Sequence, residues 1–210
     1  KGHQEDIQSI DSCRTDESLI STDIKGCVKL WDLRTGSGCT AATNTGSQTP
    51  CAATISQDGH LLAIAGTGSD YRPCVSILDR RALGRGSVSI THHQTWECMS
   101  KPIQAGGKGS MFGFSRVKFS SNNKMVVATP FEIKGRLRSR EDRPPLHTLL
   151  SKSSNGTYVV DDDLGDDITR WYRPEASFTS DSKYIIFGDE GKNLQVWRKM
   201  TEEEIDSSSN

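Results

Sequence analysis

The stretch that decides the fold is residues 2–32, which opens on Gly2-His3 and closes on Val-Lys-Leu-Trp-Asp at 28–32. Two short apolar runs, at 7–10 and 19–22, lie between these ends, and a polar turn follows each of them. Apolar runs of this length, bounded by turn residues, predict short antiparallel strands. We therefore expect three strands here, with Gly-His at the head and Trp-Asp at the tail.

The same order of features recurs three times along the chain. We expect strands at 51–56, 61–66 and 75–79 in the second copy, at 117–120, 125–128 and 157–161 in the third, and at 176–178, 184–188 and 194–197 in the fourth. A similar turn joins the first two strands of these copies: Ser-Gln-Asp-Gly at 56–59, Ser-Ser-Asn-Asn-Lys at 120–124 and Thr-Ser-Asp-Ser at 179–182. Asp, Asn and Ser favour turns because their side chains hydrogen-bond the nearby backbone. Four copies in matched order indicate one repeated structural unit.

A unit of this kind is typical of one blade of a WD-repeat β-propeller. The predicted fold class is all-β, with about four blades present of a probable seven, at about 2–44, 50–92, 113–171 and 174–200. A blade cannot bury both of its faces alone. We expect the missing blades to belong to a longer protein, in preference to an open arc that something else completes. Residues 201–210 are predicted to be an acidic disordered tail or linker.

The pairing of side chains that usually holds a WD blade together departs from its usual pattern in the first and fourth copies. In WD blades an aspartate commonly lies six residues before the tryptophan and pairs with the histidine at the head. Lys25 holds that place in the first copy and Gly191 in the fourth, with Asp23 and Asp189 two residues earlier. Either His3 lacks its usual partner, or the turn shifts to bring Asp23 to it. The sequence predicts blades that are tied less rigidly than is usual.

Residues 131–152 interrupt the third copy between its second and third strands. The prolines and charges of this segment predict a long inserted loop instead of a core strand. One interpretation is a basic arm for RNA, DNA or an acidic partner. The other is a solvated loop without a ligand, because two acids dilute the charge and no aromatic side chains are interleaved for base stacking. The residues of the candidate arm are Lys134, Arg136, Arg138, Arg140 and Arg143.

No set of catalytic or metal-binding residues stands out. The acidic run at 161–167 lacks the distal glutamate of a calcium-binding loop and is more often an exposed turn. His92-His93 and Cys98 lack a second pair of metal ligands. The phosphate-binding glycine loop, the Gly-x-Ser-x-Gly motif and the His-Glu-x-x-His motif are missing from the sequence. We expect no enzyme activity, no cofactor and no metal.

The composition narrows the classes of partner that we expect the protein to bind. With 26 basic and 27 acidic residues, the formal net charge of -1 gives no bulk attraction to nucleic acid or to an anionic membrane. No apolar run approaches the roughly 20 residues that span a bilayer, so no membrane partner is expected. The six cysteines have no Cys-x-x-Cys spacing and fall inside strand-like segments. This favours free thiols in a reducing compartment, the cytosol or the nucleus.

Several segments resemble the WD-repeat-containing protein 82 (Swd-type) family. They are Asp-Leu-Arg at 32–34, Pro-Cys-Ala at 50–52, Leu-Asp-Arg-Arg at 78–81, Phe-Ser-Arg-Val-Lys-Phe-Ser at 114–120 and Glu-Ala-Ser-Phe-Thr-Ser-Asp-Ser at 175–182. The last is the most specific, and the resemblance covers about half of the chain. The insertion at 131–152 and the junction at 170–174 depart from the family pattern.

The resemblance implies a non-catalytic scaffold or adaptor in a nuclear complex. Members of this family serve in histone methyltransferase (COMPASS-type), protein phosphatase 1–PNUTS and cleavage and polyadenylation complexes, and link them to the phosphorylated tail of RNA polymerase II. A phosphopeptide requires a basic cluster. Lys25, Arg72 and Lys192 lie in turns expected to share one rim, and they are the candidate protein-binding residues.

Two other functions remain open from the sequence. One is a structural WD-repeat subunit of a ribonucleoprotein or cytoskeletal assembly, with a cytoplasmic location as the alternative to the nucleus. The other is a nucleic-acid binder that uses the basic arm.

Overall fold

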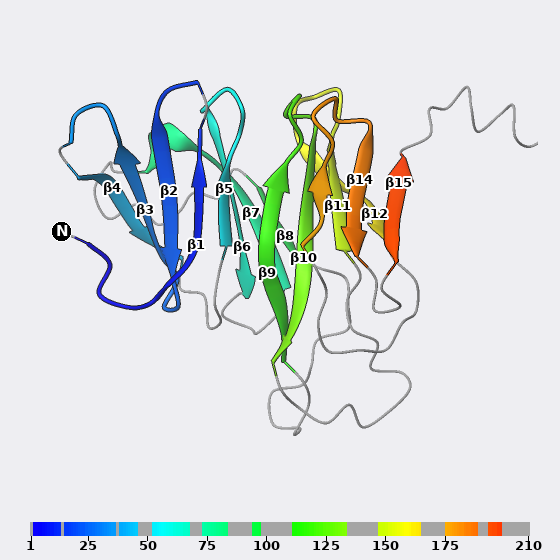
Figure 1. Ribbon diagram of the computed structural model, residues 1–210, viewed down its shortest axis with the longest axis horizontal. Coiled ribbons are helices and arrows are strands. Elements are labelled where there is room, and N and C mark those ends of the chain that lie inside the picture. The colour runs from blue at the N-terminus through cyan, green and yellow to red at the C-terminus, as the bar shows by residue number, and fades with distance from the viewer. Residues whose placement is uncertain are drawn as a thin grey trace, which may run out of the picture.

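The computed structural model describes residues 2–13, 15–36, 38–45, 52–67, 73–83, 94–97, 111–133, 147–164, 175–188 and 193–198. Within these ranges the fold is all-β, as predicted, with four antiparallel sheets and one short 3-10 helix, η1 (Arg80–Ala82) (Figure 1). None of the described helical structure is long and apolar enough to cross a membrane.

The strands follow the chain order within each sheet. The first sheet contains β1 (Ile7–Ser12), β2 (Ser18–Asp23), β3 (Cys27–Asp32) and β4 (Cys39–Asn44). The second contains β5 (Ala52–Ile55), β6 (Leu61–Thr67), β7 (Pro73–Asp79) and β8 (Gln94–Glu97). The third contains β9 (Met111–Phe119), β10 (Met125–Ile133), β11 (His147–Lys152) and β12 (Tyr158–Leu164). The fourth contains β13 (Ser177–Phe178), β14 (Tyr184–Gly188) and β15 (Leu194–Arg198).

The first three sheets each have a fourth strand beyond the three that the sequence predicted. In the first sheet this is β4, whose residues alternate between half-buried and exposed. In the second sheet it is β8, which lies past residue 92, where the predicted second blade ends. Strand β9 of the third sheet begins before residue 113, where the predicted third blade starts. The apolar pattern used to find the other strands is weak in the sequences of β4 and β8.

The predicted loop at 131–152 is wrong at both ends. Strand β10 continues to Ile133, and β11 begins at His147 and pairs with β10 and β12. His147, Leu149 and Leu150 are buried, so this segment is core. The strand predicted at 157–161 is therefore the fourth of its sheet, and residues 161–164 belong to it instead of to an exposed turn.

The four sheets stand side by side in chain order (Figure 1). An apolar layer separates each sheet from the next. Cys13, Ile20, Val28 and Leu30 of the first sheet region pack on Ala53, Ile55, Leu62, Ile64 and Leu78 of the second. Ala52, Ala63, Ala65, Val75 and Ile77 of the second pack on Phe114, Val117, Val126, Ala128, Leu150 and Tyr158 of the third. Val127 and Leu149 of the third pack on Ala176, Ile185 and Phe187.

The first strands of the sheets form one converging edge. Strand β1 lies beside β5, β5 beside β9, and β9 beside β13. Lys118 Nζ of β9 lies 3.5 Å from Asp11 Oδ1 of β1, across the intervening sheet. Sheets packed face to face are about 10 Å apart, so evenly stacked first and third sheets would be about 20 Å apart. A side-chain contact between them shows that the sheets fan out from this edge.

Candidate protein-binding surface

Three of the turns that join a first strand to a second strand have the same internal hydrogen bonds. In the second sheet Ser56 Oγ donates to Asp58 Oδ1 (2.6 Å), which also accepts the backbone N–H of His60, and Leu61 N–H donates to Ser56 Oγ (2.9 Å). The side chains therefore replace backbone partners, as the sequence predicted. The equivalent residues are Ser120, Asn122, Lys124 and Met125 in the third sheet, and Thr179, Asp181, Lys183 and Tyr184 in the fourth.

These turns contact one another across the sheets. Thr15 Oγ1 donates to the backbone oxygen of Gln57 (3.0 Å), and Gln57 N–H donates to Asn123 Oδ1 (2.8 Å). Asn122 N–H donates to Ser182 Oγ (3.1 Å). The residues at 13, 15–18, 56–61, 120–125 and 179–184 thus make one continuous surface. The turns at 33–35 and 80–83 adjoin it, because Leu33 N–H donates to the backbone oxygen of Glu17 and Arg80 N–H to that of His60. We call the whole surface the turn rim.

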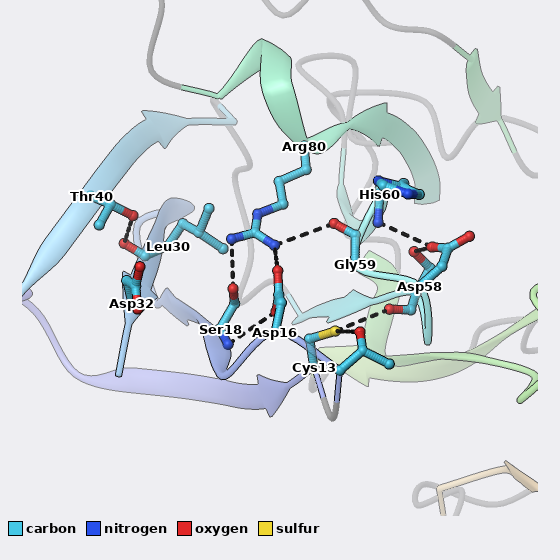
Figure 2. Close-up of polar contacts among 12 residues, drawn as sticks. Cys13, Asp16, Ser18, Leu30, Asp32, Thr40, Asp58, Gly59, His60 and Arg80 are labelled. Carbon is cyan, nitrogen blue, oxygen red and sulfur yellow. Dashed lines mark hydrogen bonds and ion pairs between the residues drawn. The ribbon is translucent and has the colours of Figure 1, made fainter. Parts of the chain in front are cut away.

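Arg80 clamps the first sheet to the second at the turn rim (Figure 2). Its guanidinium donates to the Asp16 carboxylate, to Ser18 Oγ (2.5 Å) and, at 3.4 Å, to the backbone oxygen of Gly59. Burial acts to raise the pKa of Asp16, but hydrogen bonds from Ser18, Arg80 and Cys13 outweigh it and leave that pKa lowered. The carboxylate therefore stays ionised at neutral pH and the clamp is charge-assisted.

Two other arginines on this rim pair within their own turns. Arg34 donates to Asp32 from its backbone and its guanidinium, and Arg81 does the same to Asp79. Hydrogen bonds from Arg34 lower the pKa of Asp32 to about 2. Both guanidinium groups are largely exposed, so an acidic partner that docks on the turn rim would meet them.

A second hydrogen-bond network joins the head of the first sheet to its tail. His3 Nδ1 lies 2.9 Å from Asp23 Oδ2, and His3 Nε2 lies 2.6 Å from Ser21 Oγ. Ser21 Oγ also accepts from Trp31 Nε1 (2.8 Å). The Gly-His and Trp-Asp ends of the sequence stretch therefore meet through two side chains of β2.

Asp23, not the residue at position 25, is the partner of His3. Its Oδ1 accepts the backbone N–H groups of Lys25 and Cys27, both at 3.0 Å. Burial acts to raise the pKa of Asp23, yet the hydrogen bonds from His3, Cys27 and Lys25 leave it lowered. The second alternative from the sequence is confirmed, because the turn after β2 brings Asp23 to His3. The tie expected to be weakened at Lys25 is made through Asp23 instead. Gly191 and Asp189 lie outside the described residues.

His3, Asp23 and Cys27 are residue types that bind metals, and their ligand atoms lie within 4.8 Å of one another. The ring nitrogens and the carboxylate oxygens take part in the hydrogen bonds above. Burial raises the pKa of the Cys27 thiol, whereas a metal requires the thiolate. The arrangement fits a structural tie better than a metal site.

One of the three candidate protein-binding residues is described. Lys25 is exposed in the turn between β2 and β3, where its ammonium pairs with Glu5. Arg72 and Lys192 lie outside the described residues. So do all five basic residues of the candidate arm, Lys134, Arg136, Arg138, Arg140 and Arg143.

Charged residues at the converging edge were not predicted. Glu175, just before β13, lies 3.9 Å from Lys118 and 3.7 Å from Arg116 of β9, and Lys118 also reaches Asp11. Arg80 was missed as well. Its only sequence signal is position: it follows Asp79 as Leu33 follows Asp32, and nothing local says that it reaches another sheet.

No protein-family model matches this chain.

Proposed function

We propose that this chain forms four blades of a WD-repeat β-propeller and works as a non-catalytic scaffold. Four-stranded antiparallel sheets that follow one another around a shared edge are the arrangement of a propeller. The first three sheets have four strands, the sheets are in chain order, and their first strands converge. The observation that carries the proposal is the repeated turn, which links each sheet to the next through Gln57, Asn122 and their partners.

The scaffold role rests on the turn rim and on the sequence resemblance. The rim presents exposed charged side chains on fixed turns, and a rigid platform of this kind lowers the ordering cost of binding a partner. The segments that resemble the WD-repeat-containing protein 82 family reach this rim at 33–34, 80–81, 120 and 179–182. We therefore place the chain in a nuclear complex of the histone methyltransferase, protein phosphatase 1–PNUTS or cleavage and polyadenylation type.

Affinity purification with mass spectrometry tests the complex. The tagged chain is expected to recover methyltransferase, phosphatase or polyadenylation subunits from nuclear extract. A matched bait with the turn rim altered, Arg34→Glu with Arg81→Glu, controls for non-specific capture and is expected to lose them. Recovery of ribosomal or cytoskeletal subunits alone would contradict the proposal.

Binding of phosphorylated polymerase-tail peptides tests the link to transcription. Lys25→Ala is expected to weaken binding of the phosphorylated peptide several-fold, because an ion pair made by an exposed side chain is worth up to about 1 kcal/mol. Lys124→Ala, exposed on the turn rim, is the matched control and should leave the affinity unchanged. Equal effects of the two substitutions, or equal affinity for the unphosphorylated peptide, would reject this use of Lys25.

A further inference from the structure

The first and second sheets carry the same pairing of an aspartate with an arginine, which we call the arginine fork. Asp32 Oδ1 accepts the backbone N–H and the Nε–H of Arg34, at 2.9 and 3.1 Å, and Asp32 Oδ2 accepts from Arg34 Nη2 at 2.8 Å. Asp79 holds Arg81 through the same three groups, at 2.8, 3.0 and 2.6 Å. Each aspartate therefore takes the edge of the guanidinium that Nε and Nη2 form, and it fixes the direction of the group.

The two forks occupy equivalent positions of their sheets. Asp32 pairs with Ser18 across the first sheet, and Asp79 pairs with Leu61 across the second. Ser18 and Leu61 end equivalent turns, because the backbone oxygen of each accepts the N–H that opens the turn. Ser151 stands at this position of the third sheet. The fork is therefore repeated in two neighbouring sheets and is replaced in the third.

Each guanidinium has a second edge that its aspartate leaves open. A guanidinium carries five N–H donors, and the edge formed by Nη1 and Nη2 can hold a carboxylate as well as the edge formed by Nε and Nη2. In the described part of the chain, the hydrogen bonds of both guanidinium groups run to the aspartates alone. The side chains of Arg34 and Arg81 are 59% and 83% exposed. The second edge of each fork is therefore free to bind a group from outside.

The exposure of the forks does not depend on an uncovered face of a sheet. The second sheet packs on the first and on the third, and Arg81 of this covered sheet is the more exposed of the two arginines. Arg34 holds the equivalent position of the first sheet. Both belong to turns of the turn rim, so neighbouring sheets leave them accessible.

We propose that the two forks together bind an acidic segment of a partner subunit, with one carboxylate on each free guanidinium edge. The two oxygens of a carboxylate match the two parallel N–H donors of such an edge, so each contact is bidentate. This inference rests on the scaffold function proposed above, and it names the chemistry of the partner segment that the turn rim docks.

The charge around the forks favours an acidic peptide over a nucleic acid. Each fork pairs one cation with one anion. The pKa of Arg34 is raised by its hydrogen bond to Asp32 and also by the negative charges of Asp16 and Glu17, so its surroundings are acidic. Nucleic acids bind to an excess of positive charge that releases their counterions. A bidentate contact acts at short range and needs no such excess, so the expected ligand is the singly charged carboxylate.

The distance between the forks sets the spacing of the acids. Neighbouring sheets that pack face to face are about 10 Å apart. Because these sheets fan out from their first strands, forks placed after the third strands are at least about 10 Å apart. An extended peptide advances about 3.3 Å per residue and directs alternate side chains to one side. Acids four positions apart therefore reach both forks, whereas adjacent acids reach one.

NMR titration of the 210-residue chain with two synthetic peptides tests this spacing. Both peptides contain two glutamates in an otherwise uncharged sequence, four positions apart in one and adjacent in the other. We expect the spaced peptide to bind at least about threefold tighter, because it gains a second exposed ion pair. Arg81→Lys should remove this difference, because lysine makes no bidentate contact. Equal affinities for the unaltered chain would overturn the proposal, as would tighter binding of a single-stranded RNA oligonucleotide.

Asp32→Asn combined with Asp79→Asn separates a positioned fork from attraction by charge. This double variant gains positive charge but no longer holds the two guanidinium groups. We expect it to bind the spaced peptide at least about threefold more weakly, whereas attraction by charge alone predicts tighter binding and would overturn the proposal. If the variant melts early, Arg34→Lys with Arg81→Lys decides, since it keeps the charge and loses the fork. Lys124→Ala is the matched control and should bind as the unaltered chain does.

Recovery of nuclear subunits distinguishes failure of this inference from failure of the proposed function. As a bait, Arg34→Lys with Arg81→Lys is expected to lose the same subunits as Arg34→Glu with Arg81→Glu. If the glutamate bait alone loses them, the rim docks its partners by charge and the fork inference is overturned. If both baits keep them, docking on the turn rim is overturned together with the inference.

Discussion

At the scale of single residues, His3, Ser21, Asp23 and Trp31 form one hydrogen-bonded network. Trp31 Nε1 can only donate, so Ser21 Oγ accepts from it. The Asp23 carboxylate can only accept, so His3 Nδ1–H donates to it, and His3 Nε2 lies 2.6 Å from Ser21 Oγ. Each group in the chain of bonds is satisfied, and removing one member leaves the others unpaired in a partly buried place.

Asp23→Ala should therefore destabilise the protein much more than Lys25→Ala. The first substitution unpairs His3 and two backbone N–H groups, and we expect a loss of about 1–3 kcal/mol in the free energy of unfolding. The second removes an exposed pair with Glu5, and we expect a change within about 0.5 kcal/mol. Urea denaturation of the two variants measures both values. Equal losses would mean that the residue at 25 is the tie after all.

Acid should remove the stability that the carboxylates of Asp16 and Asp23 contribute. The pKa values of Asp16 and Asp23 are lowered in the folded state, so the stability they contribute is present above the unfolded value of 3.8. It is lost as the pH falls through the lower folded pKa values. We expect the melting temperature to fall below about pH 4, and to fall less steeply in Asp16→Asn and Asp23→Asn. Asp6→Asn, at an exposed position, is the control. An acid limb as steep in both variants as in the parent would contradict this assignment.

At the scale of elements, three turns of the turn rim each have a residue with a left-handed backbone conformation (positive φ) at the same position of the turn. Gly59, Asn123 and Ser182 share that place and have φ of 73°, 55° and 60°. Glycine adopts this conformation without a steric cost. At Gly59 there is a second reason, because an added Cβ would lie 3.1 Å from the Asp16 carboxylate and 3.4 Å from the Arg80 guanidinium.

Comparing Gly59→Ala with Gly156→Ala separates these two reasons. Gly156 has φ of 86°, and an added Cβ there meets nothing within 4 Å. We expect Gly156→Ala to cost about 1 kcal/mol from backbone strain alone. Gly59→Ala should cost about 1–2 kcal/mol more, because the crowding disturbs the Arg80 clamp. Thermal unfolding of both variants provides the measurement. Equal losses of stability would show that the contact between the first and second sheets accommodates the methyl group.

Arg80 and Arg81 give a second comparison at this scale. Arg80 bridges two sheets with its guanidinium partly buried, whereas Arg81 pairs inside its own turn and is largely exposed. Arg80→Ala is expected to lower the free energy of unfolding by about 1–3 kcal/mol, and Arg81→Ala by less than about 0.5 kcal/mol. An Arg80–Asp16 double-mutant cycle should show coupling between the two sites. Additive losses would mean that the clamp contributes no pair energy.

The sequence predicts strands well where apolar and turn patterns are both strong, and poorly elsewhere. The strand at 184–188 has the predicted bounds because an apolar run follows a Ser-Asp-Ser turn. Strand β11 was missed because its short buried run directly follows a charged, proline-rich segment. The sequence left open whether His3 pairs with Asp23, because this pairing depends on how the turn after β2 closes. Arg80 was missed because its partners are on another sheet, 62 and 64 residues away.

At the scale of the whole molecule, the sheets form a linear series in which each packs its apolar core only on its neighbours. In such a series the stability is approximately the sum of the stabilities of the single sheets and of the contacts between neighbouring sheets. The second and third sheets each pack on two neighbours, whereas the first and fourth each pack on one. The fourth also has three strands in the part of the chain that the structure describes. The end sheets should therefore open more readily than the middle ones.

Amide hydrogen exchange should resolve this gradient strand by strand. Amides of β6 and β10, which lie inside covered sheets, should exchange only when most of the chain unfolds. Those of β14 and β15 should exchange through local opening, at least about tenfold faster. Uniform exchange across all four sheets would mean that they unfold as a single cooperative unit.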